Sequence, residues 1–149
     1  MKIAGELSVR APRGAVFDAL KDARVFAACV DGVQELTEID ATHYAAVFQT
    51  KIAYMTFTFN VTVEMTKAEP PDLIEGKVEG RPMGLVGRLT ATATTRLTEV
   101  GDETRIQYEI DSALTGKLGS MGQPVLKAKA KELEKGFAAR LRAKFEAQV

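Results

Sequence analysis

Residues 55–66, MTFTFNVTVEMT, decide the fold class of this 149-residue chain. Every second residue from Met55 to Met65 is apolar and each residue between them is polar, which is the period of a β-strand with one buried face. The same alternation recurs on both sides of this stretch, at residues 2–10, 44–52, 74–80, 85–97 and 106–114. It predicts a curved antiparallel sheet of about six or seven strands, whose apolar face another element must cover.

A long helical pattern occurs at the C-terminal end of the chain. Apolar residues recur there at spacings of three and four, at Leu126, Ala130, Leu133, Phe137 and Leu141. Residues 120–123 resemble a capping box at the start of this helix. Two short helices are predicted between the first two strands, one starting at Pro12 and one over residues 24–30. This order of elements indicates an α+β helix-grip fold, in which the sheet wraps around the long C-terminal helix.

The composition indicates a single globular domain over residues 1–149. Hydrophobic residues make up 46% of the chain, and the 20 basic and 20 acidic residues balance, so we expect no nucleic-acid partner. One cysteine, Cys29, excludes an intrachain disulfide and favours a reducing compartment. The sequence shows no signal peptide, and no stretch approaches the roughly 20 apolar residues that span a bilayer. We therefore expect a cytoplasmic protein.

The inward face of the predicted sheet mixes bulky and very small side chains. Gly76, Gly80, Ala91 and Ala93 leave volume that one helix fills poorly, which favours an apolar cavity. Alternatively, the glycines only permit curvature and the aromatic residues fill the core. For the cavity, we expect a lining of Phe17, Phe26, Phe48, Phe57, Phe59, Val78, Leu89, Ala91, Tyr108, Leu126, Leu133 and Phe137. We also expect a loop at its entrance that carries Met83 and Leu85.

The sequence offers no convincing catalytic set. His43 is the only histidine and points outward by alternation, so neither a zinc site nor any other metal site is expected. Cys29 has no base nearby in the pattern and is predicted to be a small buried residue. The inward polar groups are hydroxyls, which are weak acid–base catalysts without a partner, at Thr50, Thr95, Tyr108 and Ser112. We therefore predict a protein that is not an enzyme and has no tightly bound cofactor.

The predicted C-terminal helix is basic. From Pro124 onward it carries seven basic and three acidic residues. This pattern suits a solvated helix face, and it also suits a contact with anionic lipid or an acidic partner through residues such as Lys131 and Lys135.

Three stretches of the chain resemble one known family. Residues 11–20, APRGAVFDAL, are similar to its opening helix, with Phe17 where tryptophan is usual. Residues 29–32, CVDG, resemble its Cys-Ile-Pro-Gly turn, with Asp31 in place of the proline, and residues 69–71 and 84–93 match its central hairpin. The chain thus resembles the carbon monoxide dehydrogenase G-subunit (CoxG) family of the SRPBCC, or START/Bet v1-like, superfamily, over nearly its whole length.

The resemblance implies a hydrophobic cavity under the long helix and a non-catalytic accessory role beside a molybdenum hydroxylase such as CO dehydrogenase. It implies an apolar ligand, an isoprenoid quinone or a lipid, and a place at the inner face of the membrane. Two alternatives remain open: a surface-mediated assembly or membrane-recruitment factor, and a cyclase- or hydrolase-like enzyme on the same fold that uses Tyr108, Thr50 and Ser112.

Overall fold

The computed structural model describes residues 1–146 and contains one seven-stranded antiparallel sheet and three α-helices. The helix-grip architecture predicted from the sequence is confirmed. The strand order is β1-β7-β6-β5-β4-β3-β2, with every neighbouring pair antiparallel. The strands are β1 (Lys2–Val9), β2 (Val33–Glu38), β3 (His43–Ile52), β4 (Met55–Glu69), β5 (Leu73–Pro82), β6 (Gly87–Val100) and β7 (Glu103–Gly116).

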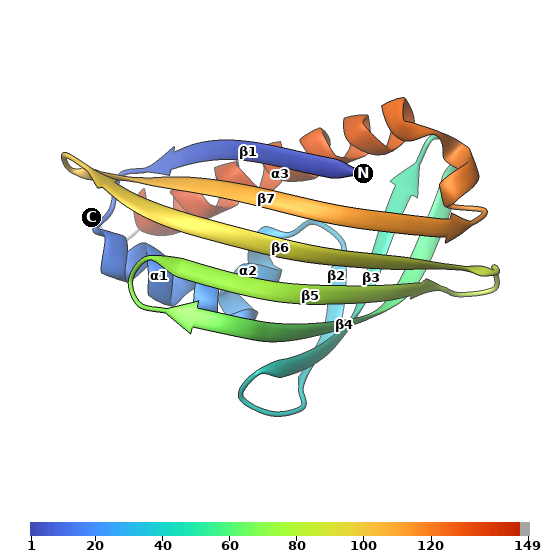
Figure 1. The fold of residues 1–149 in the computed structure, drawn as a ribbon, viewed down its shortest axis with the longest axis horizontal. Coiled ribbons are helices and arrows are strands. Elements are labelled where there is room, and N and C mark those ends of the chain that lie inside the picture. The colour runs from blue at the N-terminus through green and yellow to red at the C-terminus, as the bar shows by residue number, and fades with distance from the viewer. Residues whose placement is uncertain (147–149) are drawn as a thin grey trace.

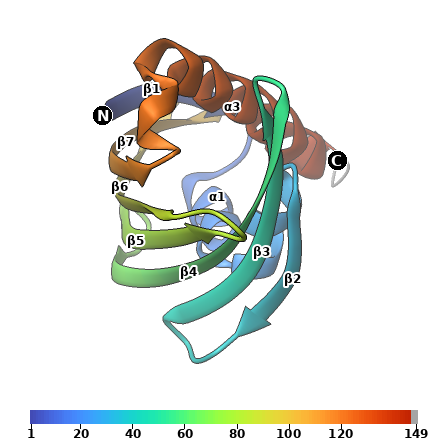
Figure 2. The same ribbon diagram turned by 90° about the vertical axis from the view of Figure 1, so that its right-hand side faces the viewer.

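The helices lie at two places in the chain. Between β1 and β2 are α1 (Arg13–Lys21) and α2 (Ala23–Cys29), and after β7 come a 3₁₀ turn, η1 (Gly119–Met121), and the long α3 (Gln123–Glu146). The sheet curves so strongly that α3 lies along its open side (Figure 1; Figure 2). Close backbone approaches of α3 are to β1, β3 and α2, whereas the central strands β4–β7 come near it only marginally. The helix therefore bridges the two margins of the curved sheet.

Local chemistry sets the ends of the helices. Pro12 precedes α1 with φ of −63°, and Asp22 begins α2 by accepting hydrogen bonds from the Arg24 and Val25 amides. The predicted capping box at residues 120–123 is wrong. Ser120 lies in η1 and donates its hydroxyl to the Lys117 carbonyl at 2.7 Å, because a separate turn precedes α3.

The longest strand is β4, with 15 residues. Its pairing with β5 shifts by one residue between Met65 and Lys67, which is a β-bulge. Gly76 lies opposite this bulge, where an added Cβ would be 3.2 Å from the Glu64 carbonyl oxygen. The bulge and this close approach explain how one strand passes from one wall of the sheet to the other.

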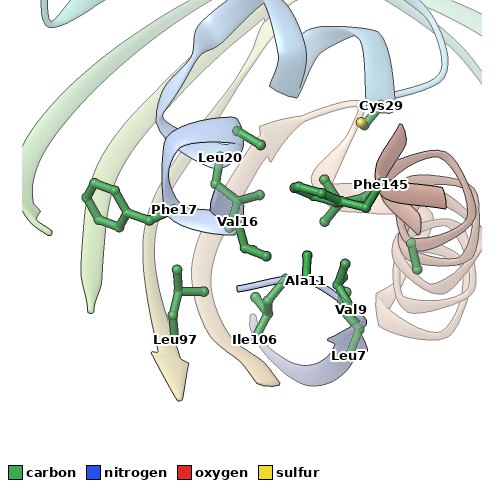
Figure 3. Packing of buried hydrophobic residues seen from close by; sticks show 13 residues of the cluster. Leu7, Val9, Ala11, Val16, Phe17, Leu20, Cys29, Leu97, Ile106 and Phe145 are labelled. Atoms are coloured by element: carbon green, nitrogen blue, oxygen red, sulfur yellow. The ribbon is translucent and has the colours of Figure 1, made fainter. Parts of the chain in front are cut away.

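Two separate hydrophobic clusters form at opposite ends of the strands. The first joins α1, α2, β1, β6, β7 and the C-terminal half of α3; Figure 3 shows its Phe145 directed toward Val16. The second lies near the β3–β4 turn and contains Ile52, Phe57, Phe59 and Leu118. Beside the first cluster, Thr104 is fully buried and its hydroxyl donates to the Ala11 carbonyl at 2.7 Å. The core is thus divided, and its middle part belongs to neither cluster.

Candidate ligand-binding site

The inward-facing apolar side chains between the two clusters are only half-buried. On the sheet they are Val63, Val78, Leu89, Ala91, Ala93 and Ile110, and on α3 they are Leu126, Ala130 and Leu133. A continuous core would bury both sets, because protein interiors pack closely. Each of these residues therefore keeps part of its surface accessible to water. We call these nine residues the central apolar face.

The small side chains of this face explain why it stays open. Val78 pairs with Ala91 across β5 and β6, and Ala93 pairs with Gly76 on the same two strands. Neither pair has the volume to meet a helix that is supported at the margins of the sheet and not at its centre. The small inward residues of β5 and β6 thus lie on strands that α3 approaches less closely than it approaches β1 and β3.

The structure distributes the predicted lining residues over three environments. Half-buried members of the central apolar face are Val78, Leu89, Ala91, Leu126 and Leu133. Six further residues lie at the two ends of this face. Phe17 belongs to the first cluster, and Phe57 and Phe59 belong to the second. The other three pack against one cluster or the other, namely Phe48, Tyr108 and Phe137. Phe17, Phe57 and Phe59 are no more than 3% exposed, so they have almost no free surface.

Phe26 and the predicted entrance loop lie at the surface. Phe26 is 45% exposed on α2, with its ring centroid 5.0 Å from that of Phe137. Met83 is 58% exposed on the β5–β6 turn, whereas Leu85 in the same turn packs against the second cluster. The loop therefore has one side chain toward solvent and one toward the interior.

A polar pair borders the central apolar face. Tyr108 of β7 is half-buried, and burial, followed by its interaction with the Glu134 carboxylate, raises the pKa of its hydroxyl. Glu134 is itself half-buried on α3. Glu134 was not among the residues predicted from the sequence, although its place four residues after Ala130 and three before Phe137 puts it on the apolar stripe. A hydroxyl with a raised pKa stays protonated at neutral pH, so Tyr108 can donate a hydrogen bond but is a poor base.

Of the other inward hydroxyl groups, that of Ser112 has a structural role, whereas the contacts among the described residues give none for those of Thr50 and Thr95. Ser112 is buried and donates to the Met1 carbonyl at 3.2 Å, which ties the start of β1 to β7. Thr50 and Thr95 are half-buried without a side-chain hydrogen bond among residues 1–146.

Cys29 is buried as predicted, and burial raises the pKa of its thiol. No group of three or more metal-ligating side chains gathers within the described part of the chain.

A hollow of about 620 Å³ lies along strands β3–β7 of the sheet. Its lining combines outward-facing polar residues, among them His43 and Lys77, with Val63, Val78 and Ala91 of the central apolar face, and no residue of α3 contributes to it. His43 is half-exposed, with Nδ1 2.9 Å from an Asp40 carboxylate oxygen and Nε2 3.6 Å from Glu64. The hydrogen bond between His43 and Asp40 is the main cause of the raised pKa of His43. A backbone hydrogen bond from Thr42, followed by His43, lowers the pKa of Asp40 to about 2.

Solved structures with the same fold define the class of protein. A conserved protein from Geobacillus kaustophilus superposes with a TM-score of 0.90 at 24% identity, over 99% of this chain and 96% of that one. A START superfamily protein from Mycobacterium smegmatis gives 0.73 at 14% identity over 99% of both chains. Ara h 8.0201 gives 0.67 at 11% identity, over 99% and 98%. The fold is thus that of the START/Bet v1-like proteins.

The profile of one family matches almost the whole chain. It is the carbon monoxide dehydrogenase G-subunit family (CoxG), matched over residues 5–146. The chain belongs to the CoxG family, as the sequence motifs predicted. A comparison with curated proteins found no match. Within the described residues, no helix combines the length and apolar character needed to cross a membrane.

Proposed function

We propose that this protein is a non-catalytic accessory that binds an apolar small molecule between α3 and the central strands. The observation that supports this most directly is the half-buried central apolar face, flanked by two closed clusters. Apolar surface that water reaches is costly to leave uncovered and gains roughly 25 cal/mol per Å² when a ligand covers it. An apolar ligand is therefore the natural occupant of this region.

We further propose that the ligand is an isoprenoid quinone or a lipid and that the protein serves a molybdenum hydroxylase such as CO dehydrogenase in the cytoplasm. Membership of the CoxG family supports the link to such an enzyme. The Tyr108 hydroxyl beside the central apolar face supports a ligand with a polar head, because a protonated phenol can donate to a carbonyl oxygen. Among the described residues that border the central apolar face, Tyr108 carries a protonated phenol, which is a poor general base, and this supports a carrier over an enzyme.

The test is binding of a short-chain ubiquinone or menaquinone analogue to delipidated protein, measured by calorimetry and by native mass spectrometry. We expect one molecule per chain, and Ala91→Trp should abolish binding because the indole fills the space beside Val78. The matched control is Thr98→Trp on the same strand, which is exposed and lies on the outer face.

Binding that survives Ala91→Trp in a folded protein would place the ligand elsewhere, and no binding of any quinone, fatty acid or sterol to the wild type would reject the carrier function. Co-purification of a molybdenum hydroxylase from a host that expresses one would test the partnership separately.

A further inference from the structure

We infer that Tyr108 and Glu134 recognise the polar head of the ligand, and that this pair selects a head with a hydroxyl donor over a head with only carbonyl or ether oxygens. Among quinones, the selected form is the reduced one, the hydroquinone. The inference rests on the proposed function, because it concerns the occupant of the same apolar region.

The polar pair lies at one end of the central apolar face. Along β7, Ile110 and Leu114 follow Tyr108 on the same side of the strand, and Leu114 packs against the second cluster. Along α3, Leu126 lies about two turns before Glu134, close to the start of the helix. Strand β7 runs toward the end of the molecule at which α3 begins (Figure 1). A ligand with its head at the pair therefore has apolar side chains of both elements along its tail.

A glycine on β1 lets the Tyr108 hydroxyl reach α3. Gly5 pairs with Tyr108 across β1 and β7, and the phenol oxygen occupies the space that a Cβ atom of residue 5 would need. The ring therefore leans over β1, a strand that α3 approaches closely, and away from Thr95 on β6. Glu134 is half-buried on the helix side, and burial, followed by the hydrogen bond with Glu134, raises the pKa of Tyr108. The phenol thus keeps its proton and shares it with the carboxylate.

Glu134 has no cationic partner within residues 1–146. The ion pairs that α3 forms there are Lys129–Glu132, at 2.9 Å, and Arg140–Asp31, at 3.7 Å. A carboxylate has about four acceptor positions, and the Tyr108 hydroxyl fills one of them. A ligand that covers this region removes water from the other positions, which is costly unless the ligand supplies a donor in its place.

The single proton of the phenol decides which head the pair accepts. A carbonyl or ether head can bind the Tyr108 hydroxyl only by taking its proton away from Glu134, because a phenol has one proton to donate. The carboxylate then loses its donor where the ligand excludes water. A hydroxyl head donates its own proton to Glu134 and leaves the pair intact. Hydrogen bonds to charged groups are the stronger ones, so we expect a preference of about tenfold or more for the hydroxyl head.

Two ligands that differ only in the donor test this preference without a redox step. They are para-nonylphenol and its methyl ether, para-nonylanisole, each titrated into delipidated protein by calorimetry. We expect the wild type to bind the phenol about tenfold or more tightly than the ether. Glu134→Met has a side chain of similar length without the carboxylate and should lower this ratio about tenfold, and Glu134→Gln, which keeps a neutral acceptor, should lower it less.

The matched control is Glu132→Met, which removes an exposed carboxylate two residues earlier on α3 and should leave the ratio unchanged. Because the ratio compares two ligands on one protein, a variant that is partly unfolded does not distort it. The same comparison under anaerobic conditions, with the reduced and oxidised forms of a short-chain ubiquinone analogue, should give the same order of affinity and the same dependence on Glu134.

Equal affinity of the wild type for phenol and ether, or a ratio that Glu134→Met leaves unchanged, would overturn the inference. A preference for the phenol that does not extend to the hydroquinone would overturn the assignment of the redox form. Binding of both probes without preference rejects the selection and leaves the carrier function in place, whereas a protein that binds neither probe and no quinone rejects the carrier itself.

Discussion

The ring of Tyr108 lies across Gly5, its cross-strand partner, so closely that a Cβ atom at Gly5 would be 2.2 Å from the Tyr108 hydroxyl oxygen. The missing side chain on β1 thus makes room for Tyr108, whose hydroxyl interacts with Glu134 of α3. Glycine inside a strand normally weakens it, and an aromatic residue that covers the glycine compensates for part of that loss.

Replacing Gly5 with alanine should therefore displace the Tyr108 ring. We expect Gly5→Ala to lower the free energy of unfolding by ~1–3 kcal/mol, as overpacking does, measured by urea denaturation. In a Tyr108→Ala background the same change should be neutral or stabilising, because alanine suits a strand better than glycine once the ring is gone. Equal effects of Gly5→Ala in both backgrounds would show that the two residues are not coupled.

Two leucines on α3 provide a test of the divided core. Leu141 is 1% exposed in the first cluster, whereas Leu133 is half-buried in the central apolar face. We expect Leu141→Ala to cost ~2–5 kcal/mol of unfolding free energy and Leu133→Ala much less, by the same urea titration. Leu133→Phe should be tolerated, because the space beside it is not filled. Equal costs for the two alanine variants would contradict an open centre.

Thr104 holds the connection between β1 and α1. Its fully buried hydroxyl donates to the Ala11 carbonyl, and Thr104→Val would leave that oxygen without its partner while keeping the shape of the side chain. We expect a loss of ~1–3 kcal/mol in unfolding free energy. Thr104→Ser keeps the hydroxyl and should retain more of the stability, although it loses a methyl group. A valine variant as stable as wild type would show that the hydrogen bond contributes little.

The His43–Asp40 pair should titrate detectably. Because the pKa of His43 is raised above 6.5, its contribution to stability is present below that pH and is lost as pH rises through the folded-state pKa. Asp40 acts in the other direction: its lowered pKa of about 2 gives a contribution that is present above 3.8 and is lost as pH falls through about 2. Both groups are exposed, so the effects on stability are small.

The measurement is an NMR titration of the single histidine. Asp40→Asn should bring the pKa of His43 back toward 6.5, because it removes the main cause of the shift, and Glu64→Gln should have a smaller effect in the same direction. A His43 pKa that does not respond to Asp40→Asn would show that the hydrogen bond is not formed in solution.

The sequence anticipated the strands and long helix better than it anticipated the site. Alternation from Met55 to Met65 and the stripe from Leu126 to Leu141 are local periodicities, and they gave the fold directly. The short strand β2 was not recognised, because its pattern is interrupted by a bulge after Gln34 with Glu35 at φ of 51°. The prediction of a capping box at Ser120 was wrong for a related reason, because a four-residue motif does not show that a separate 3₁₀ turn precedes the helix.

The placement of the predicted lining residues needed tertiary structure. Alternation predicts that Phe57 and Ala91 lie on the same face of the sheet. It does not predict that Phe57 is buried in the cluster at one end of the sheet while Ala91 is only half-buried. That difference depends on where α3 crosses the sheet. Glu134 and Tyr108 come from elements distant in sequence, so no local pattern could have paired them.

By itself the sequence determined the α+β class, the antiparallel sheet, the covering helix and the family, because these follow from local periodicity and short motifs. Tertiary structure alone decided that the core divides into two clusters and that half-buried apolar residues remain between them. The physical reason is that burial depends on contacts between residues far apart in the chain, and the curvature of the sheet sets those contacts.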